Sequence, residues 1–262
     1  MEDGKHCESA VGLSFKIGEA LLRNGAEIFR VQETMERVAH AYGIEEYDVY
    51  VLSNAIFANA VENGERIESK LKFVPGSTVH LGRVDAINQL SREITEGRHT
   101  VAEACARLKE ITAIPYTRPI SMILSCGVGS ACFSYLFGGS IWDTLAALLC
   151  GFVLEVFLLL LNRRSVSKFI SNLVSSALVA VCAVLLFSLG IGNDLDKIII
   201  GSIIRLVPGI ALTTSIRDFL SGDYLSGTIR MIDAFLIGGC IAIGVGVIVM
   251  LYVTLTGGAP LV

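Results

Sequence analysis

Five long apolar stretches follow residue 116 and constrain the fold more than any other feature of the chain. A helix needs roughly 20 apolar residues to cross the ~30 Å hydrocarbon core of a bilayer. The approximate bounds of the stretches are 120–137, 141–161, 169–191, 198–216 and 231–255. With 53% hydrophobic residues and a mean hydropathy of +0.64, the chain of 262 residues is also too apolar for an ordinary soluble protein. We therefore expect an α-helical membrane protein with about five transmembrane helices.

Charged residues are concentrated before these stretches, which predicts a separate N-terminal domain. We place a cytoplasmic domain at 1–116 and a membrane domain at 117–262. Periodicity and turn residues predict helices at 8–23, 26–42, 84–96 and 101–111, strands at 47–51, 55–61 and 67–74, and a hairpin turn at Glu62-Asn63-Gly64. Thr100 and Glu103 have the spacing of a capping box. The pattern indicates a small α+β or α/β domain, of which we take α+β as the prediction.

The Lys and Arg residues between the stretches predict the orientation of the chain. The second and fourth linkers carry Arg163, Arg164, Lys168, Arg217 and Arg230, whereas the first has no Lys or Arg and the third has only Lys197. Positively charged loops stay in the cytoplasm. We therefore expect a multi-pass protein of the inner (plasma) membrane, with its N-terminus in the cytoplasm and its C-terminus outside. The acidic start of the chain has no pattern of a cleavable signal peptide, which agrees with this orientation.

An odd number of spans predicts a partner. Many secondary carriers combine two halves of opposite orientation, and this sequence has no internal repeat. A second membrane subunit or a second copy of the chain would have to supply the other half. The alternative is that the five helices only anchor the N-terminal domain in the lipid bilayer.

Sequence motifs of catalysis, metal binding and nucleic-acid binding are missing. There is no G-x-S-x-G, phosphate-binding loop or H-E-x-x-H pattern, and His80 is an isolated histidine for which a structural or surface role is expected. The seven cysteines include no C-x-x-C pair, so we expect neither disulfides nor a zinc site, and read them as small buried hydrophobes. Acidic residues outnumber basic ones up to residue 116. We predict no enzyme, no cofactor, no metal and no nucleic-acid partner.

The fourth stretch is interrupted by a charge and by a helix breaker. Arg205 lies about a third of the way through it, and a charge in hydrocarbon costs roughly 2.5–3.5 kcal/mol even on the lenient scale. Arg205 either binds a carboxylate or extends to the near interface. Pro208-Gly209 is either a simple kink or a functional break lining a cavity. The hydroxyls of Thr213, Thr214 and Ser215 follow the break as further candidate partners.

Glu155 is the other charge within an apolar stretch. It either pairs with Arg205 or binds and releases a proton, because burial raises the pKa of a carboxyl group. A permanent pair would be structural, whereas a protonatable Glu155 would couple export to the proton gradient. Asp233, and Asp218 with Arg217, are expected at the cytoplasmic boundary.

Three runs of the sequence resemble the threonine/serine exporter family. The run RLVPGIALTTSIRDFLSGDYLSGTIRMIDA at 205–234 has that family's Val-Pro-Gly, Thr-x-Ser-Ile-Arg-Asp and Gly-Asp-x-x-Ser-Gly pattern. The runs LLRNGAEIFRVQETMERVAHAYG and HLGRVDAINQLSREITEG resemble its cytoplasmic helices. The resemblance covers nearly the whole chain.

The resemblance implies an inner-membrane exporter of small carboxylated metabolites. Full-length members of the family have a cytoplasmic domain and about ten spans, and this chain is similar to the larger subunit of split members, which are associated with succinate export. The membrane motif carries over to Arg205, Pro208, Gly209, Thr213, Ser215, Arg217, Asp218, Gly222, Asp223 and Ser226. The cytoplasmic motif carries over to Asn24, Gly25, Glu27, Arg30, Glu33 and Thr34. The family's soluble domain has been likened to hydrolases, but no nucleophile here supports a catalytic role.

Two hypotheses follow from these observations. The first is a subunit of a secondary transporter that exports threonine, serine or a succinate-like dicarboxylate, completed by a second, smaller membrane subunit or by self-association. In it, Arg205 engages the carboxylate of the substrate near the helix break. The second is a membrane-anchored regulatory or sensory domain without transport of its own.

Overall fold

The computed structural model divides the chain into two compact units. They are an N-terminal unit, Met1–Tyr116, and a C-terminal unit, Thr117–Val262. The structure describes residues 9–62, 65–74, 79–115, 118–162 and 166–256. The predicted hairpin turn at Glu62-Asn63-Gly64 falls partly outside these ranges.

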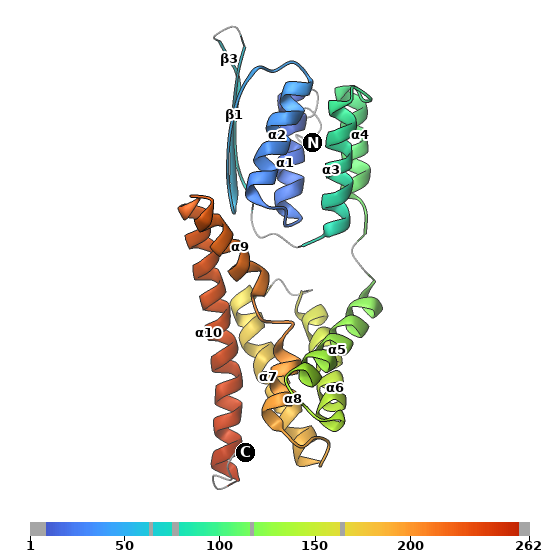
Figure 1. Cartoon of the computed structure of the whole chain (residues 1–262), viewed down its shortest axis with the longest axis vertical. Helices are drawn as coiled ribbons and strands as arrows, with labels where there is room; N and C mark the ends of the chain where they lie inside the picture. Colours follow the sequence, from blue (N-terminus) through green and yellow to red (C-terminus); the bar gives the residue numbers. More distant parts are fainter. Residues whose placement is uncertain (1–8, 63–64, 75–78, 116–117, 163–165, 257–262) are drawn as a thin grey trace. The chain divides into compact units, whose positions relative to one another are not determined.

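The N-terminal unit combines helices with a small antiparallel sheet (Figure 1). Its elements are α1 (Ala10–Arg23), α2 (Ile28–Ala41), β1 (Glu46–Leu52), β2 (Ala55–Glu62), β3 (Glu65–Phe73), α3 (Leu81–Thr95) and α4 (Val101–Thr112). The strands pair in the order β1-β2-β3, with Tyr50 opposite Phe57 and Phe57 opposite Leu71. The predicted α+β class is confirmed, because the strands form sequential hairpins rather than βαβ crossovers.

Local signals in the sequence set the ends of these helices. The side chain of Ser9 accepts a hydrogen bond from the Gly12 amide at the start of α1. Gly25 follows the end of α1 at φ 81°, a left-handed conformation that favours glycine. Thr100 and Glu103 form the predicted capping box at α4, with each side chain bonded to the other residue's amide.

The core of the N-terminal unit lies where the helices pack together and against one face of the sheet. β1 alternates buried and exposed residues along its length, and α1 and α2 cover the buried face. The largest fully buried side chains include Leu13, Ile17, Met35, Ile56, Ile87 and Leu90. The opposite face exposes Tyr50, Phe57 and Leu71.

One cysteine of this unit differs from the sequence prediction. Cys105 in α4 is disulfide-bonded, although the scattered cysteines suggested no disulfide. Cysteine spacing carries no information about which thiols the tertiary fold brings together, and this is why the prediction was wrong.

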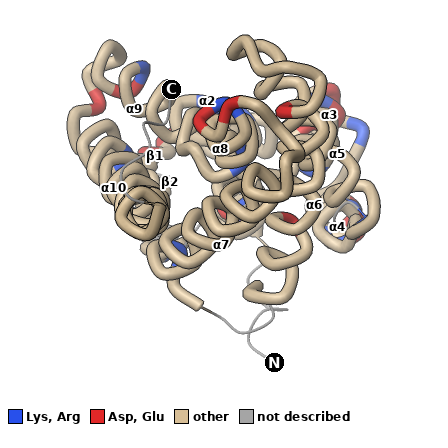
Figure 2. The backbone as a smooth tube through the Cα atoms, turned by 90° about the horizontal axis from the view of Figure 1, so that it is seen from below, with Lys and Arg blue, Asp and Glu red and all other residues tan. Residues whose placement is uncertain are grey.

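The described residues of the C-terminal unit form helices joined by turns, with no strand among them (Figure 1). Its elements are α5 (Pro119–Leu136), α6 (Ile141–Asn162), α7 (Lys168–Ser188), α8 (Leu195–Ile203), α9 (Gly209–Leu220) and α10 (Tyr224–Leu255). Among the described helices, α5, α6, α7 and α10 are long and apolar enough to cross a membrane. α10 lies beside α7, and the tubes of both are mostly free of charged residues (Figure 2).

The segment predicted as a fourth span, 198–216, forms two helices instead of one. α8 ends at Ile203 and α9 begins at Gly209. Pro208 lacks an N–H and disfavours helical backbone in the residue before it, so the helix cannot continue through this point. The fifth predicted span, 231–255, starts earlier, because the Asp223 side chain accepts a hydrogen bond from the Ser226 amide and caps α10.

Small residues and a buried carboxylate hold α8 in place. A Cβ atom on Gly201 would lie 2.7 Å from the Ser134 backbone nitrogen and 2.8 Å from the Ser130 carbonyl oxygen, so α5 and α8 touch through their backbones. Asp143 is fully buried, and its Oδ1 accepts hydrogen bonds from the amides of Asn193 (2.6 Å) and Asp194 (2.9 Å). Its Oδ2 accepts two more from the amide and hydroxyl of Ser140. This carboxylate therefore fixes the start of α8 against the start of α6.

Candidate functional site

The break between α8 and α9 is a short turn that carries Arg205. The Leu206 amide donates to the Ile203 carbonyl at 2.8 Å, and the Gly209 amide donates to the Val207 carbonyl at 2.9 Å. Pro208 has φ −80° and ψ 51°, outside the helical region. These short-range hydrogen bonds give partners to some of the backbone amides and carbonyls that a broken helix leaves without them.

Arg205 reaches Glu155 of the neighbouring helix α6. Its Nε lies 3.3 Å from Glu155 Oε2. The Glu155 side chain is only 2% exposed, whereas that of Arg205 is 50% exposed. Glu155 Oε2 accepts no hydrogen bond within the described part of the chain, so the contact is an ion pair without the two-bond fork of a guanidinium and a carboxylate.

A cavity of about 450 Å³ surrounds this pair. Glu155, Arg205 and Pro208 line it together with Lys168 and Asn172 from α7. Further lining residues include Met122 of α5, Ile237 of α10 and Ala211 of α9. The structure thus brings three of the residues singled out in the sequence to one cavity, which contains both charged and apolar side chains.

Lys168 and Asn172 were not among the site residues predicted from the sequence. Lys168 forms an ion pair with Asp233 of α10, and Asn172 donates a hydrogen bond through Nδ2 to the Lys168 carbonyl. Lys168 was assigned only to a positively charged loop. The available signal was the polar run Ser171-Asn172 inside the third apolar stretch.

Gly209, Thr213 and Thr214 do not line this cavity. The hydroxyl of Thr213 donates to the Gly209 carbonyl at 3.0 Å, and that of Thr214 donates to the Ile210 carbonyl at 2.7 Å. Ser215 is buried and donates to the Leu212 carbonyl. These hydroxyls bond to their own helix, as Ser and Thr commonly do inside helices.

The remaining residues of the membrane motif shape the turn between α9 and α10. Asp218 Oδ2 lies 3.5 Å from Arg230 Nε, which ties the end of α9 to α10. Gly222 has φ 83°, and Asp223 caps α10. Arg217 is exposed in the last turn of α9. Asp218, Gly222 and Asp223 therefore have a structural explanation that requires no ligand.

The cytoplasmic motif is likewise built around one turn, between α1 and α2. Asn24 is 4% exposed and donates through Nδ2 to the Ala20 carbonyl at 2.7 Å. Glu27 is the residue before α2 and lies 4.0 Å from Arg30. Thr34 is 2% exposed within the core, whereas Glu33 is exposed. No group of three or more His, Cys, Asp or Glu among the described residues has the geometry of a metal site.

Comparison with known proteins matches nearly the whole chain. Residues 13–252 match the family model described as "Putative threonine/serine exporter". The chain is 24% identical over 246 residues to a "Probable threonine/serine exporter" of Mycobacterium tuberculosis, covering 93% of this chain and 46% of the relative. It therefore spans about half the length of this relative.

Two shorter relatives match over most of their length. A "Probable succinate transporter subunit YjjP" of Klebsiella aerogenes is 25% identical over 231 residues, covering 86% of this chain and 87% of the relative. The protein of the same name in Escherichia coli (strain K12) is 24% identical over 239 residues, covering 89% and 91%. No solved structure matches the chain.

The family match confirms the resemblance of the sequence motifs. It covers α1 to α10 apart from the first helical turn of α1 and the last residues of α10. The chain belongs to the threonine/serine exporter family.

Proposed function

We propose that this chain is a subunit of a secondary transporter that exports small carboxylated metabolites across the cytoplasmic membrane. The observation that carries the proposal is the cavity of about 450 Å³ in which Arg205 and Glu155 meet beside the break between α8 and α9. Broken helices at the centre of a transporter place backbone and charged groups where a polar substrate can reach them. The family membership and the names of the relatives support the same function.

Arg205 is the group proposed to bind the substrate. The atom of its guanidinium that faces the Glu155 carboxylate at 3.3 Å is Nε. A substrate carboxylate can therefore approach the two Nη groups and form the fork that Glu155 does not form. Glu155 would keep the guanidinium oriented and compensate its charge while the cavity is empty.

The other polar groups of the cavity suggest how two kinds of substrate would differ. The ammonium group of threonine or serine would need an anionic partner, and Glu155 is the carboxylate of the cavity. The second carboxylate of a succinate-like acid would need a second cation, and among the described lining residues Lys168 of α7, which pairs with Asp233, is the candidate. Glu155→Gln should then reduce amino-acid export more than dicarboxylate export, and Lys168→Gln should do the reverse.

A second membrane subunit would complete the transporter. Two of the relatives carry the word "subunit" in their names, and the mycobacterial relative is about twice as long as its matched region. In the proposed orientation the N-terminal unit lies in the cytoplasm and the C-terminus lies outside, as the Lys and Arg residues of the linkers indicate. The family membership gives no support to catalysis, and no catalytic role is proposed.

The direct test is efflux from vesicles or cells that hold this chain and its second subunit. Arg205→Ala should lower efflux at least about tenfold, since a charge-assisted hydrogen bond contributes roughly 1.5–3 kcal/mol. Arg205→Lys should retain part of the activity, because it keeps the charge and loses the fork. Lys197→Ala is the control, because Lys197 pairs with Asp196 near the start of α8 and does not line the cavity.

The same experiment separates transport from anchoring. Unchanged efflux from Arg205→Ala at an equal level in the membrane would reject the role of this side chain. Absence of efflux from vesicles that hold both wild-type subunits would favour the membrane-anchored regulatory domain instead.

A further inference from the structure

An apolar groove lies between α10 and the turn that follows α8. It measures about 460 Å³, and its described lining residues carry no charge. One side is formed by Ile203, Val207 and Pro208. The other side belongs to α10, and its lining residues are Gly238, Ile241, Ala242, Val245, Gly246 and Val249. This part of α10 falls inside the apolar stretch 231–255, so the groove lies at the depth of the lipid hydrocarbon.

The α10 side of the groove has small residues four positions apart. Gly238, Ala242 and Gly246 repeat at this spacing, which places them on one face of the helix. Apart from its own helix, a Cβ atom added to Gly238 or Gly246 would meet no described atom within 4 Å. Glycine inside a helix costs roughly 1 kcal/mol relative to alanine. No contact within the described chain accounts for the two glycines.

Gly244 shows how the same helix uses a glycine against a neighbour. A Cβ atom there would lie 2.5 Å from the Leu173 carbonyl oxygen, so α10 comes close to the backbone of α7. Small residues allow membrane helices to approach each other in this way. Gly238 and Gly246 line the groove instead, so they permit the same close approach by a helix that does not belong to the described chain.

The groove shares a wall with the cavity proposed to bind the substrate. Val207 and Pro208 line both of them, and Arg205 lies in the same turn. A helix in the groove would therefore support this turn from one side while Arg205 faces the cavity on the other. This arrangement would bring the second half of a transporter beside the broken helix.

The length of the mycobacterial relative indicates which occupant fits the groove. This chain matches 46% of that relative, and the rest of the relative lies outside the match. The counterpart of the rest would here be a separate polypeptide, rather than a second copy of this chain. A lipid chain would fill the groove as well, but it makes no use of the close backbone approach that glycines permit.

We propose that a membrane-spanning helix of the second subunit occupies this groove, with its backbone against Gly238, Ala242 and Gly246. The inference rests on the proposed function, which requires that subunit, and it adds the surface that the subunit contacts. The partner helix is apolar and has small residues where it crosses α10, because close approach requires them on both helices.

Photo-crosslinking in intact cells tests the proposal with the full chain. The photoreactive residue p-benzoylphenylalanine replaces either Ala242, which lines the groove, or Val247, which is exposed on α10 and does not line it. Mass spectrometry then identifies the adducts. The residue at position 242 should form an adduct with an apolar segment of a second polypeptide, similar in sequence to the unmatched part of the mycobacterial relative. The residue at position 247 should not.

Two glycine variants make the test specific. Gly238→Leu fills the groove and should lower the yield of the adduct at least about tenfold, because the added side chain overpacks the contact. Gly129→Leu makes the same change in α5, at a glycine that is equally open and lines neither the groove nor the cavity. It should leave the yield unchanged. Both variants replace a glycine inside a helix where space is available, so both should fold.

Several outcomes would overturn the proposal. They are adducts only with lipid, with a second copy of this chain or with a polypeptide that lacks the expected similarity, and equal adducts from positions 242 and 247. Equal losses in Gly238→Leu and Gly129→Leu would also overturn it, because bulk at any open glycine would then have the same effect.

The crosslinking result does not depend on transport. Arg205→Ala should leave the yield of the adduct unchanged. The expected adduct together with an absence of efflux would reject the proposed function and retain the groove as an interface. Efflux that depends on Arg205, without the expected adduct, would reject the groove alone.

Discussion

The ion pair between Arg205 and Glu155 should stabilise the C-terminal unit asymmetrically. The two partners differ in burial, since the Glu155 side chain is 2% exposed and the Arg205 side chain is 50% exposed. Arg205→Gln would leave a carboxylate buried without its cation, whereas Glu155→Gln would leave a guanidinium that still faces the cavity. Arg205→Gln and Glu155→Gln should therefore lower the free energy of unfolding by different amounts, although both remove the same ion pair.

The loss of unfolding free energy in each variant depends on how deeply the remaining charged side chain is buried. Opposite charges about 4 Å apart attract each other by about 4 kcal/mol at an effective dielectric constant of 20, before desolvation is subtracted. Removing one partner of a fully buried pair costs about 3–5 kcal/mol. We expect Arg205→Gln to approach the lower end of this range, and Glu155→Gln to cost about 1 kcal/mol or less, because the exposed guanidinium keeps its solvation.

A double-mutant cycle measures this asymmetry. The free energy of unfolding is compared in bicelles for the wild type, both single variants and the double variant. The double variant should be more stable than Arg205→Gln alone, since it removes the buried charge as well as its partner. Equal costs for the two single variants, with additive behaviour in the double variant, would refute the reasoning.

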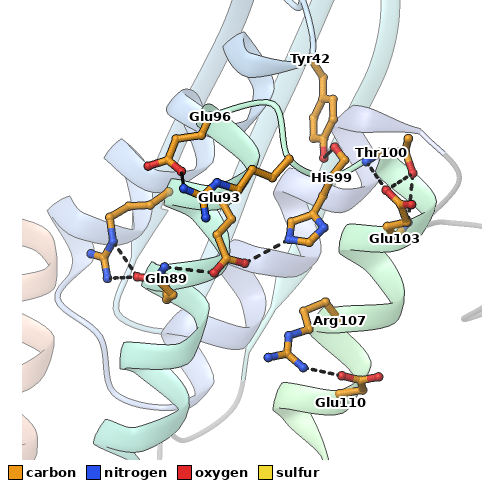
Figure 3. A network of polar contacts seen from close by, with 11 residues as sticks. Tyr42, Gln89, Glu93, Glu96, His99, Thr100, Glu103, Arg107 and Glu110 are labelled. Carbon is orange, nitrogen blue, oxygen red and sulfur yellow. Dashed lines mark hydrogen bonds and ion pairs between the residues drawn. The ribbon is translucent and has the colours of Figure 1, made fainter.

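Three other predictions concern the stability of the two units. Gly201→Ala should destabilise the C-terminal unit by about 1–3 kcal/mol, measured by unfolding in bicelles, because the new methyl group meets the α5 backbone; unchanged stability would contradict the observed contact. Asp143→Asn should cost about 2–3 kcal/mol in the same assay, since the amide nitrogen cannot accept the hydrogen bonds that the carboxylate receives; an equally stable variant would show that the four bonds contribute little. The N-terminal unit should lose stability as the pH falls below about 4.5, because hydrogen bonds hold the pKa of Glu93 and Glu103 below their ordinary value of 4.5 (Figure 3). Measured by denaturant unfolding, Glu103→Gln should lose less unfolding free energy in acid than the wild type. An identical pH profile for the two would count against this cause.

The sign of the pH effect follows from the direction of the two shifts. The Gln89 and His99 side chains donate to the Glu93 carboxylate, and the amide and hydroxyl of Thr100 donate to that of Glu103. These bonds favour the charged form, so the pKa of each group is lower in the folded chain than in the unfolded chain. The stabilisation is present above the unfolded pKa and is lost as the pH falls through the folded pKa.

Features determined by neighbouring residues could be predicted from the sequence. The capping box of Thr100 and Glu103 lies within one helical turn, and the α+β class follows from local periods and turns. The interruption at Pro208-Gly209 was visible because proline acts on its own backbone. The interruption produces two short helices in place of one span. That outcome depends on the hydrogen bonds that the freed backbone groups form within the turn.

Features determined by tertiary contacts could not be predicted in the same way. The sequence does not single out Asp143, because Asn193 and Asp194 are about fifty residues away and donate to it only through their backbone amides. Lys168 and Asn172 join the cavity because α7 packs against α8 and α10, which no local pattern indicates. The pairing of Arg205 with Glu155 was one of two readings of the sequence, and the structure places the two groups 3.3 Å apart.

Access of water and substrate to the cavity tests the central claim most directly. Ala211 lines the cavity beside Arg205, and Ala242 lies in an apolar groove formed with Val245 and Ile241. Each is replaced separately, as Ala211→Cys and Ala242→Cys, in a background without the native cysteines, and a membrane-impermeant thiol reagent is applied to vesicles of both orientations. A thiol reacts as its thiolate, which requires contact with water.

We predict that Ala211→Cys is labelled, that threonine or succinate slows the labelling, and that Ala242→Cys is not labelled. Absence of labelling at Ala211→Cys, or labelling that neither substrate slows, would contradict the account of Arg205 and the broken helix as the path of an exported acid.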